Sequence, residues 1–232
     1  FVAYSAGNSA RMRIYIRPVG GGRTIPLTDD STAVETKARW SPDGESLLFL
    51  TGGGASIAPA LGGTARRVVA PGIDGVPSAA WSPTGNEIAF VRDDSLQVVP
   101  VSGSPARLLA TIPEPHSCAW SPDSRWIACA QFNNMATIPG VNFGNLAPGT
   151  IVLVPAEGGT PVELFKRVAS YASPVWAPEG RRLYFVSNRD GPRDVYAISL
   201  GSSGKVRGLP ERVTTGPGAT SVSLSGDGRR LA

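Results

Sequence analysis

The chain has 232 residues and a formal net charge of +4, with 41% hydrophobic and 17% charged residues. This balance is typical of a globular protein and excludes a disordered chain. The basic residues are scattered and form no run or stripe, so we expect no nucleic-acid binding by this chain. Two cysteines and one histidine are too few for a Cys/His zinc site. No apolar stretch approaches roughly 18 residues, so we expect no membrane insertion.

The first segments of the chain are short and strand-like. The 28 glycines and 21 prolines are spread evenly, which favours many turns and disfavours long helices. Near the N-terminus the sequence "RIYIRPVGGG", followed by "TIPLT", predicts two short β-segments within 13–28.

One motif then recurs along the chain. "WSPDG" begins at Trp40, "WSPTG" at Trp81, "WSPDS" at Trp120 and "WAPEG" at Trp176, and a degenerate copy, "LSGDG", begins at Leu224. An apolar run follows each full copy, over 47–50, 88–91, 127–130 and 183–186. A polar or glycine-rich break and two further strand-like runs complete the period. Four short β-segments in a period of about 40 residues predict one blade of a β-propeller.

The motif itself is interpreted as a turn. Pro42 presets φ, Asp43 suits the next position, and Gly44 takes the left-handed one, which predicts a hairpin of the type I plus bulge kind. Asp43 is exchanged for Thr84 and Glu179 in other copies, which a catalytic acid would not tolerate. Asp123 and Asp227 are interpreted in the same way, and the repeated Trp as a core residue between blades. The predicted structural positions are Trp40, Pro42, Asp43, Gly44, Trp81, Pro83, Trp120, Pro122, Trp176 and Pro178.

The two cysteines, Cys118 and Cys129, flank the third copy of the motif. Their spacing places them on neighbouring strands of one hairpin. We expect reduced, buried thiols rather than a disulfide, and the cysteines leave the cellular compartment open.

The copies "ARWSPDGESLLFL", "AAWSPTGNEIAFV", "CAWSPDSRWIACA" and "LYFVSNRDGPRDVYAISL" resemble the PD40, or WD40-like, repeats of TolB-type proteins. The resemblance implies an all-β fold, a β-propeller of four-stranded blades, over nearly the whole chain. The copy at Leu224 departs from the pattern because it lacks the Trp and the Pro. The expected blades are 221–232 with 1–28, 37–70, 77–110, 117–165 with an insertion at 131–149, and 173–214.

About five repeat periods are present, and the two ends match one repeat when joined as "RRLAFVAYS". A closed five-bladed ring and a segment of a ring of six to eight blades both fit this match. We favour the segment, because a natural ring usually closes between strands and this one would be cut inside a strand.

Candidate binding residues are expected on the face opposite the Pro-Asp-Gly turns, because loops on a rigid scaffold usually carry binding. The insertion at 131–149 combines Asn with apolar side chains. It suits a protein or peptide partner, and a self-packed loop is the alternative. His116, in a Pro-bounded loop, is expected to be a surface or capping residue. The candidates are Arg92, Asp93, Asp94, His116, Phe132, Asn134, Phe143, Asn145, Asn188 and Arg189.

We expect no catalytic residue, metal site or cofactor. Asp29-Asp30 and Asp93-Asp94 lack the spacing of a calcium loop, and no G-x-S-x-G elbow is present. The leading hypothesis is therefore a non-catalytic scaffold for a protein, a peptide or a small ligand. TolB-type propellers are, by resemblance, often periplasmic, so we expect an extracytoplasmic location, with the cytoplasm as the alternative.

The parent protein is a separate question. By resemblance, the chain would be the sensor or interaction part of a larger bacterial regulator that is linked to a kinase or a winged-helix domain. The alternative is the substrate-gating propeller of a prolyl-oligopeptidase-like or tricorn-like peptidase, or of an amidohydrolase. A third hypothesis, a propeller enzyme in its own right, is disfavoured by the single histidine.

Overall fold

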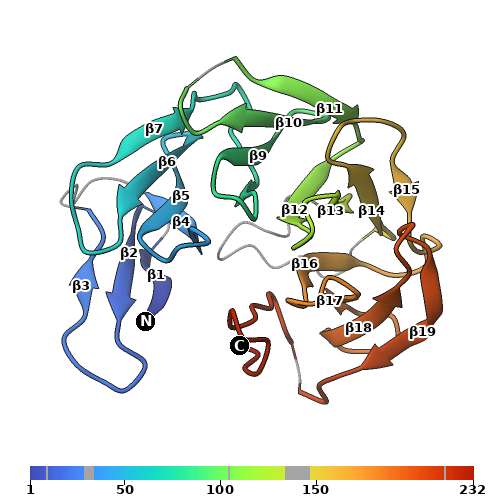
Figure 1. The fold of residues 1–232 in the computed structure, drawn as a ribbon. Helices are drawn as coiled ribbons and strands as arrows, with labels where there is room; N and C mark the ends of the chain where they lie inside the picture. Colours follow the sequence, from blue (N-terminus) through green and yellow to red (C-terminus); the bar gives the residue numbers. More distant parts are fainter. Residues whose placement is uncertain (9, 29–33, 104, 134–146, 217) are drawn as a thin grey trace. The chain divides into compact units, whose positions relative to one another are not determined.

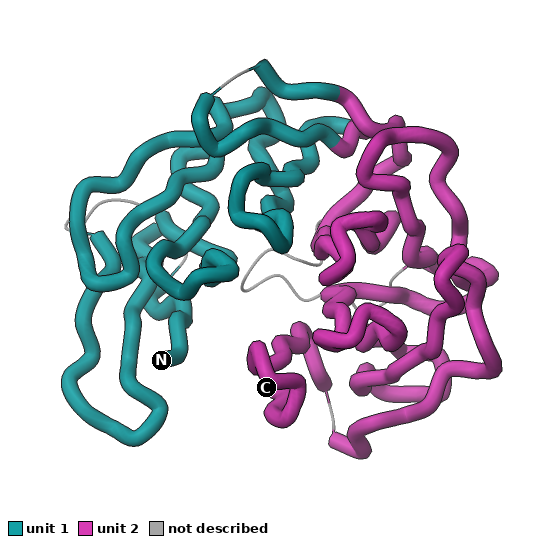
Figure 2. The backbone as a smooth tube through the Cα atoms, viewed as in Figure 1, with its two compact units in different colours: residues 1–93, 97–107 teal, residues 94–96, 108–232 magenta. Residues whose placement is uncertain are grey.

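The computed structural model describes residues 1–8, 10–28, 34–103, 105–133, 147–216 and 218–232. These residues form β-strands joined by turns and include no helix that is long and apolar enough to cross a membrane. They divide into two compact units (Figure 2). Unit 1 comprises Phe1–Asp93 and Gln97–Arg107, and unit 2 comprises Asp94–Leu96 and Leu108–Ala232.

The strands form five sheets in which neighbouring strands follow chain order (Figure 1). The first sheet has three strands and the other four have four strands each, within the described residues. The predicted all-β architecture of four-stranded sheets is confirmed. The strands are β1 (Val2–Asn8), β2 (Arg11–Arg17) and β3 (Ile25–Pro26); β4 (Glu35–Trp40), β5 (Ser46–Thr51), β6 (Gly54–Pro59) and β7 (Arg66–Val69); β8 (Ala79–Trp81), β9 (Glu87–Arg92), β10 (Ser95–Pro100) and β11 (Arg107–Thr111); β12 (Pro115–Trp120), β13 (Trp126–Gln131), β14 (Thr150–Pro155) and β15 (Val162–Glu163); β16 (Tyr171–Trp176), β17 (Arg182–Ser187), β18 (Asp194–Leu200) and β19 (Val206–Arg212).

The continuous apolar runs arise because the sheets are buried on both faces. In β5, Leu47 and Phe49 pack with Ile14 of β2, whereas Leu48 and Leu50 pack in a second core that includes Phe90 of β9. Successive side chains of a strand point to opposite faces, so a strand between two neighbouring sheets needs apolar residues at every position.

The core of unit 2 is aromatic. Tyr171, Phe185 and Tyr196 are buried between the sheet of β12–β15 and the sheet of β16–β19. Phe165 stacks on Tyr171 with ring centroids 4.8 Å apart, and the rings of Phe185 and Tyr196 are 6.1 Å apart. Aromatic side chains bury a large area each and so dominate the packing of a thin sheet-on-sheet core.

A second repeated feature was not predicted from the sequence. The first strand of three sheets has a register shift at a residue in the left-handed region, namely Lys37 (φ 54°), Ser117 (φ 50°) and Ser173 (φ 51°). The Lys37 Nζ donates a hydrogen bond to the carbonyl oxygen of Pro77 at 2.8 Å. The Ser173 hydroxyl donates to the carbonyl of Val222 at 3.2 Å and accepts from the N–H of that residue at 3.1 Å. At two of these bulges, therefore, a side chain is tied to the backbone that precedes the next repeat.

Candidate functional site

In the turn after β4, the Ser, the Asp and the Gly of the motif each take part in a hydrogen bond. The Ser41 hydroxyl donates to Asp43 Oδ1 at 2.5 Å, and the N–H of Glu45 donates to the same oxygen at 3.0 Å. The N–H of Ser46 donates to the Ser41 hydroxyl at 2.9 Å. Gly44, with φ of 74°, donates to the carbonyl of Ser41 at 2.9 Å. The hydrogen bonds from Ser41, followed by that from Glu45, hold the pKa of Asp43 below its usual value.

The same bonds recur in the other copies. Ser121 donates to Asp123 at 2.6 Å and Ser225 to Asp227 at 2.5 Å, and Ser82 pairs with Thr84 at 3.1 Å. Ser124 takes the glycine position with φ of 59°. The WAPEG copy has lost the Ser together with the Asp, and among the described residues its turn is held by backbone bonds alone, from Ala177 to Arg182 and from Gly180 to Ala177. This joint loss was visible in the sequence and was the signal that the Ser and the Asp act as a pair.

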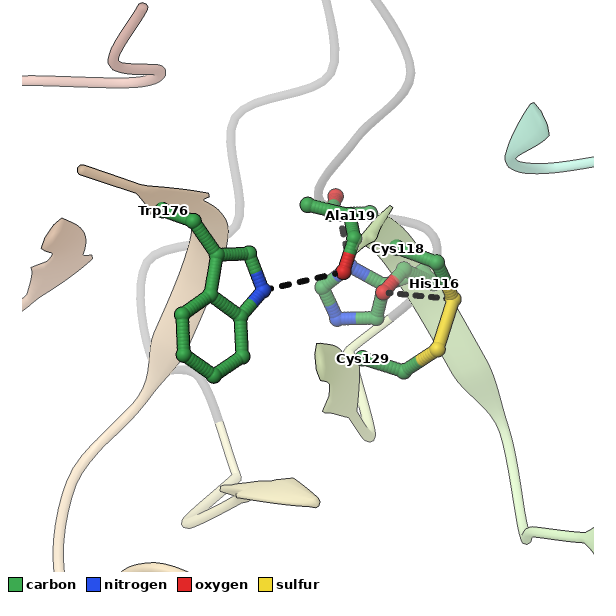
Figure 3. The surroundings of a disulfide bond; sticks show 6 residues. His116, Cys118, Ala119, Cys129 and Trp176 are labelled. Carbon is green, nitrogen blue, oxygen red and sulfur yellow. Dashed lines mark hydrogen bonds between the residues drawn. A yellow bond between two sulfur atoms is a disulfide. The ribbon is translucent and has the colours of Figure 1, made fainter. Parts of the chain in front are cut away.

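The Trp of the motif connects neighbouring sheets. Trp81 Nε1 donates to the carbonyl of Arg39 at 3.2 Å, and Trp176 Nε1 donates to the carbonyl of Ala119 at 3.1 Å (Figure 3). Trp40 is half-buried against the core around Ile14, and Trp120 is buried.

The Pro and the Gly of the motif also meet across neighbouring repeats. A Cβ at Gly85 would lie 3.7 Å from Cδ of Pro42, and a Cβ at Gly180 would lie 3.7 Å from Cδ of Pro122. A Cβ at Gly228 would lie 3.0 Å from Cδ of Pro178. Pro83 occupies the same turn position between β8 and β9. The turns that carry Pro42, Pro122 and Pro178 therefore pack on the turn of the next repeat.

Cys118 and Cys129 form a disulfide, so the expectation of reduced thiols is wrong (Figure 3). The cysteines lie on the adjacent strands β12 and β13, as the spacing predicted, and their Cα atoms are 4.1 Å apart. The bulge between His116 and Ala119 shifts the register of β12 and brings Cys118 opposite its partner. A bulge cannot be located from spacing alone, which is why the sequence left the bond undecided.

Of the two roles expected for His116, a surface residue or a capping residue in a loop, the surface position is wrong, and the residue lies in a strand and not in a loop. His116 is in strand β12 and is 1% exposed. Its Nδ1 pairs with the Ser117 hydroxyl at 3.0 Å, and its Nε2 pairs with the carbonyl oxygen of Phe132 at 2.7 Å. The imidazole thus holds the chain that follows β13, and it is not presented to a ligand.

Three other candidates bond to the backbone of neighbouring segments through their side chains. Asp94 Oδ1 accepts from the N–H of Glu114 at 2.8 Å, and Asn188 Oδ1 accepts from the N–H of Ser170 at 2.8 Å. Arg92 donates to the carbonyl of Ala70 at 2.6 Å and lies over the Phe90 ring. Asp93 is exposed in the turn, with φ of 51°. Asn134, Phe143, Asn145, Asp29 and Asp30 lie outside the described residues.

Phe132 and Arg189, both half-buried, lie on the same side of unit 2 as several exposed groups. We call this side the loop face and define it by residues 131–133, 147–149, 164–170 and 188–193. The guanidinium of Arg167 lies 4.8 Å from the centroid of the Phe132 ring, and Val168 beside it is 76% exposed. The N–H of Gly149 donates to the carbonyl of Ala169 at 2.8 Å, which connects two of these segments.

A partly buried ion pair lies beside the loop face, with its carboxylate buried and its guanidinium partly exposed. Asp194 is fully buried, pairs with Arg212 and accepts from the Thr214 hydroxyl at 3.0 Å. Burial acts to raise the pKa of Asp194, but the bonds from Arg212 and Thr214 outweigh it and lower that pKa. Arg189 lies over the Tyr196 ring, 5.8 Å from its centroid. Burial, followed by the Asp190 carboxylate, raises the pKa of Tyr196.

A cleft of about 220 Å³ opens at the other ends of these strands, beside the turns. Two consecutive motif turns, 121–126 and 177–182, form its walls with the β18–β19 turn. The side chains of Asp123, Arg125, Trp126, Trp176, Glu179 and Arg181 line it. This cleft was missed, although Trp126, the one Trp outside the repeated motif position, was a signal in the sequence.

No protein-family model matches the chain. No curated protein matches it either. Its fold is similar to solved β-propeller structures. A protein designated TolB from Agrobacterium tumefaciens aligns at a TM-score of 0.71 and 19% identity, covering 90% of this chain and 72% of that one. TolB from Acinetobacter baumannii aligns at 0.75 and 14%, covering 99% of this chain and 56% of that one. A chain of a nidogen/laminin complex aligns at 0.71 and 10%, covering 99% and 83%.

These similarities establish the fold, a TolB-like β-propeller built from four-stranded blades. The size of the complete ring and the blade boundaries stay predictions. At these identities, the arrangement of side chains has to carry any argument about function.

Proposed function

We propose that this chain is a non-catalytic binding scaffold whose loop face recognises a protein or peptide partner. The observation that supports it best is the group formed by Phe132, Arg167 and Val168. Val168 is 76% exposed, the Phe132 ring is half-buried, and the Arg167 guanidinium covers that ring. Arginine and aromatic side chains with an apolar neighbour are the composition enriched at the centres of protein interfaces.

The rigidity of the loop face also supports the proposal. His116 fixes Phe132 by its backbone carbonyl, and Asn188 fixes the segment that carries Arg167. The neighbouring Arg189 has a side chain that is 26% exposed and is held between the Tyr196 ring and Asp190. Groups that are held in place before binding lose less conformational entropy when a partner arrives.

Chemistry by this chain is disfavoured by the position of its single histidine. Both imidazole nitrogens of His116 are hydrogen-bonded inside the fold, and the side chain is buried. A general base has to reach a substrate proton, and this one cannot do so without unfolding its strand.

The variant pair Arg167→Ala and Val168→Asp tests the partner surface. Both residues are exposed, so the fold should persist while capture of a partner by cross-linking in the source cells is lost. The matched control is Leu209→Ser, which changes an apolar side chain of β19 that is 83% exposed. Equal capture by the wild type and the loop-face variant would contradict the assignment of this surface.

We further propose an extracytoplasmic location, most simply the periplasm of a bacterium. The buried Cys118–Cys129 disulfide supports it, because such bonds form and persist in oxidising compartments and are rare in the cytosol. Acid quenching of cells, followed by denaturation, alkylation and mass spectrometry, measures the state of the two thiols. Alkylated cysteines in the native protein would argue for the cytoplasm.

The parent protein is proposed to be a larger bacterial protein, a regulator linked to a kinase or a winged-helix domain. The alternative is a peptidase or an amidohydrolase that uses the propeller to admit substrate. The coding sequence around this chain distinguishes the two. A kinase or helix-turn-helix motif supports the regulator, and a G-x-S-x-G elbow supports the peptidase.

A further inference from the structure

The cleft between the turns of unit 2 combines an aromatic wall with charges of both signs. Trp126 and Trp176 line it, together with the acid and the arginine of two consecutive motif turns. Asp123 and Arg125 come from one turn, and Glu179 and Arg181 occupy the same positions in the next. The cleft therefore holds two carboxylates and two guanidinium groups, whose formal charges cancel.

The aromatic wall is held rigidly. The Trp176 indole is fixed by its bond to Ala119, as described above. Trp126 is half-buried, and the backbone of Gly204 is packed so closely on it that a Cβ at Gly204 would lie 3.3 Å from Cζ2 of the ring. Gly204 has φ of 76°, so the turn also needs a glycine there. Since these contacts fix both rings, a ligand would meet a preformed apolar surface.

The charged side chains of the cleft are of two kinds: some bond within their own turn, and others are exposed. Asp123 is used inside its own turn, where it accepts from Ser121, from the N–H of Arg125 and from Arg125 Nε at 2.7 Å. That last bond uses Nε, so the guanidinium still has terminal N–H donors. Within the described part of the chain, Glu179 and Arg181 form no ion pair, and both are exposed. The cleft thus offers a carboxylate acceptor beside guanidinium donors.

We propose that this cleft binds one ring of a neutral carbohydrate. A sugar ring has an apolar C–H face that stacks on an indole, and its hydroxyl groups both donate and accept hydrogen bonds. An anionic ligand would need an excess of guanidinium groups and a cationic one an excess of carboxylates, and neither excess is present. At about 220 Å³ the cleft is smaller than the roughly 300–1,000 Å³ of sites for drug-sized ligands, which suits a single ring.

This binding site is independent of the partner surface proposed above. It lies at the opposite ends of strands β13 and β17 from the loop face, and none of its side chains is shared with that face. A glycan could therefore be held on one side of unit 2 while a partner occupies the other.

The test is a titration of the full chain with methyl glycosides of glucose, galactose and N-acetylglucosamine, followed by saturation-transfer NMR and tryptophan fluorescence. We expect binding in the millimolar range, as for other ligands of about 12 heavy atoms. Arg181→Gln should weaken it about tenfold, because one charged hydrogen bond is lost, and Trp126→Ala should abolish it. Trp126 is half-buried, and its replacement by Ala could unfold the protein. Arg181 is exposed, so Arg181→Gln should keep the fold and still test the cleft.

Arg229→Gln is the matched control, since Arg229 has the same turn position in the copy at Leu224 and is not part of the cleft. It should bind the sugars as the wild type does. The proposal is overturned if none of the glycosides binds, or if inorganic phosphate or choline occupies the cleft instead. Equal affinity of Arg181→Gln and wild type, or an equal loss in Arg229→Gln, would overturn it as well.

Discussion

The indole N–H of Trp176 donates a hydrogen bond to the backbone carbonyl of Ala119, 3.1 Å away and one repeat earlier in the chain. Trp81 makes the same bond to Arg39 in unit 1. In these two copies the Trp thus gives a pair of neighbouring sheets both an apolar contact and a polar contact that fixes their relative position, whereas Trp120 Nε1 is buried and has no hydrogen-bond partner in the described structure. The ring and the N–H make separate contributions, which a substitution by Phe can distinguish.

Trp176→Phe should lower the free energy of unfolding by about 1–3 kcal/mol, because a buried hydrogen bond is lost while an aromatic ring is kept. Urea unfolding measures this difference. Trp126→Phe is the control, because Trp126 donates no comparable inter-sheet bond in the described part of the structure and should cost less. Equal losses in the two variants would show that ring volume alone matters at Trp176.

Asp43→Asn should reduce the acid sensitivity of the protein. The folded pKa of Asp43 lies below the usual 3.8, so its stabilising contribution is present above that value and is lost as the pH falls through the folded pKa. Thermal melts of wild type and variant from about pH 5 to about pH 2 should therefore converge toward the acid end. Partner binding should be unaffected, because the carboxylate bonds only within its own turn. Parallel curves would contradict the assigned role.

Because of Lys37, we expect the free energy of unfolding to rise at alkaline pH. Burial, followed by the neighbouring Arg39, lowers the pKa of Lys37 to about 8 from 10.5. Between these two values the unfolded chain binds a proton that the folded chain has released, so the free energy of unfolding increases with pH. The melting temperature should rise between about pH 8 and about pH 10, the interval between the folded and unfolded pKa values of Lys37. The rise should disappear in Lys37→Met, and a rise that persists there would have to come from another group.

The disulfide should contribute about 3 kcal/mol to stability, because it restricts the unfolded chain. The loop that it closes joins residues 11 apart in sequence. The double variant Cys118→Ala and Cys129→Ala removes the bond and keeps small apolar side chains in the core. Its unfolding midpoint in urea should fall accordingly, and that of the wild type should fall by a similar amount after reduction in denaturant. A double variant as stable as the oxidised wild type would show that the hairpin needs no crosslink.

The repeated motif made the fold predictable, because its chemistry is local. Pro42, Asp43 and Gly44 each suit one position of a turn, and the exchange of Asp43 for Thr84 already argued against catalysis. The partner of the Asp, the hydroxyl two residues before it, was overlooked, although the WAPEG copy loses both groups together. A pair within five residues of chain can be inferred from sequence, since no distant part of the molecule is involved.

The candidate site was less predictable, and His116 shows why. A histidine between Pro115 and Ser117 resembles a loop residue, and only the bulge in β12 turns it inward to Phe132. The same bulge brings Cys118 against Cys129. The cleft beside Trp126 arises where two turns from different sheets meet, and nothing in either turn alone indicates the other.

The amino-acid sequence by itself determined the strand pattern, the turns and the propeller class of this protein, because each depends on residues close together in the chain. Tertiary structure alone decided which candidate side chains are already used inside the fold, which thiols are joined and where a cleft opens. These properties depend on register shifts and on contacts between neighbouring sheets. The shift of one residue in a strand reverses the face to which its side chains point, and spacing along the chain does not reveal it.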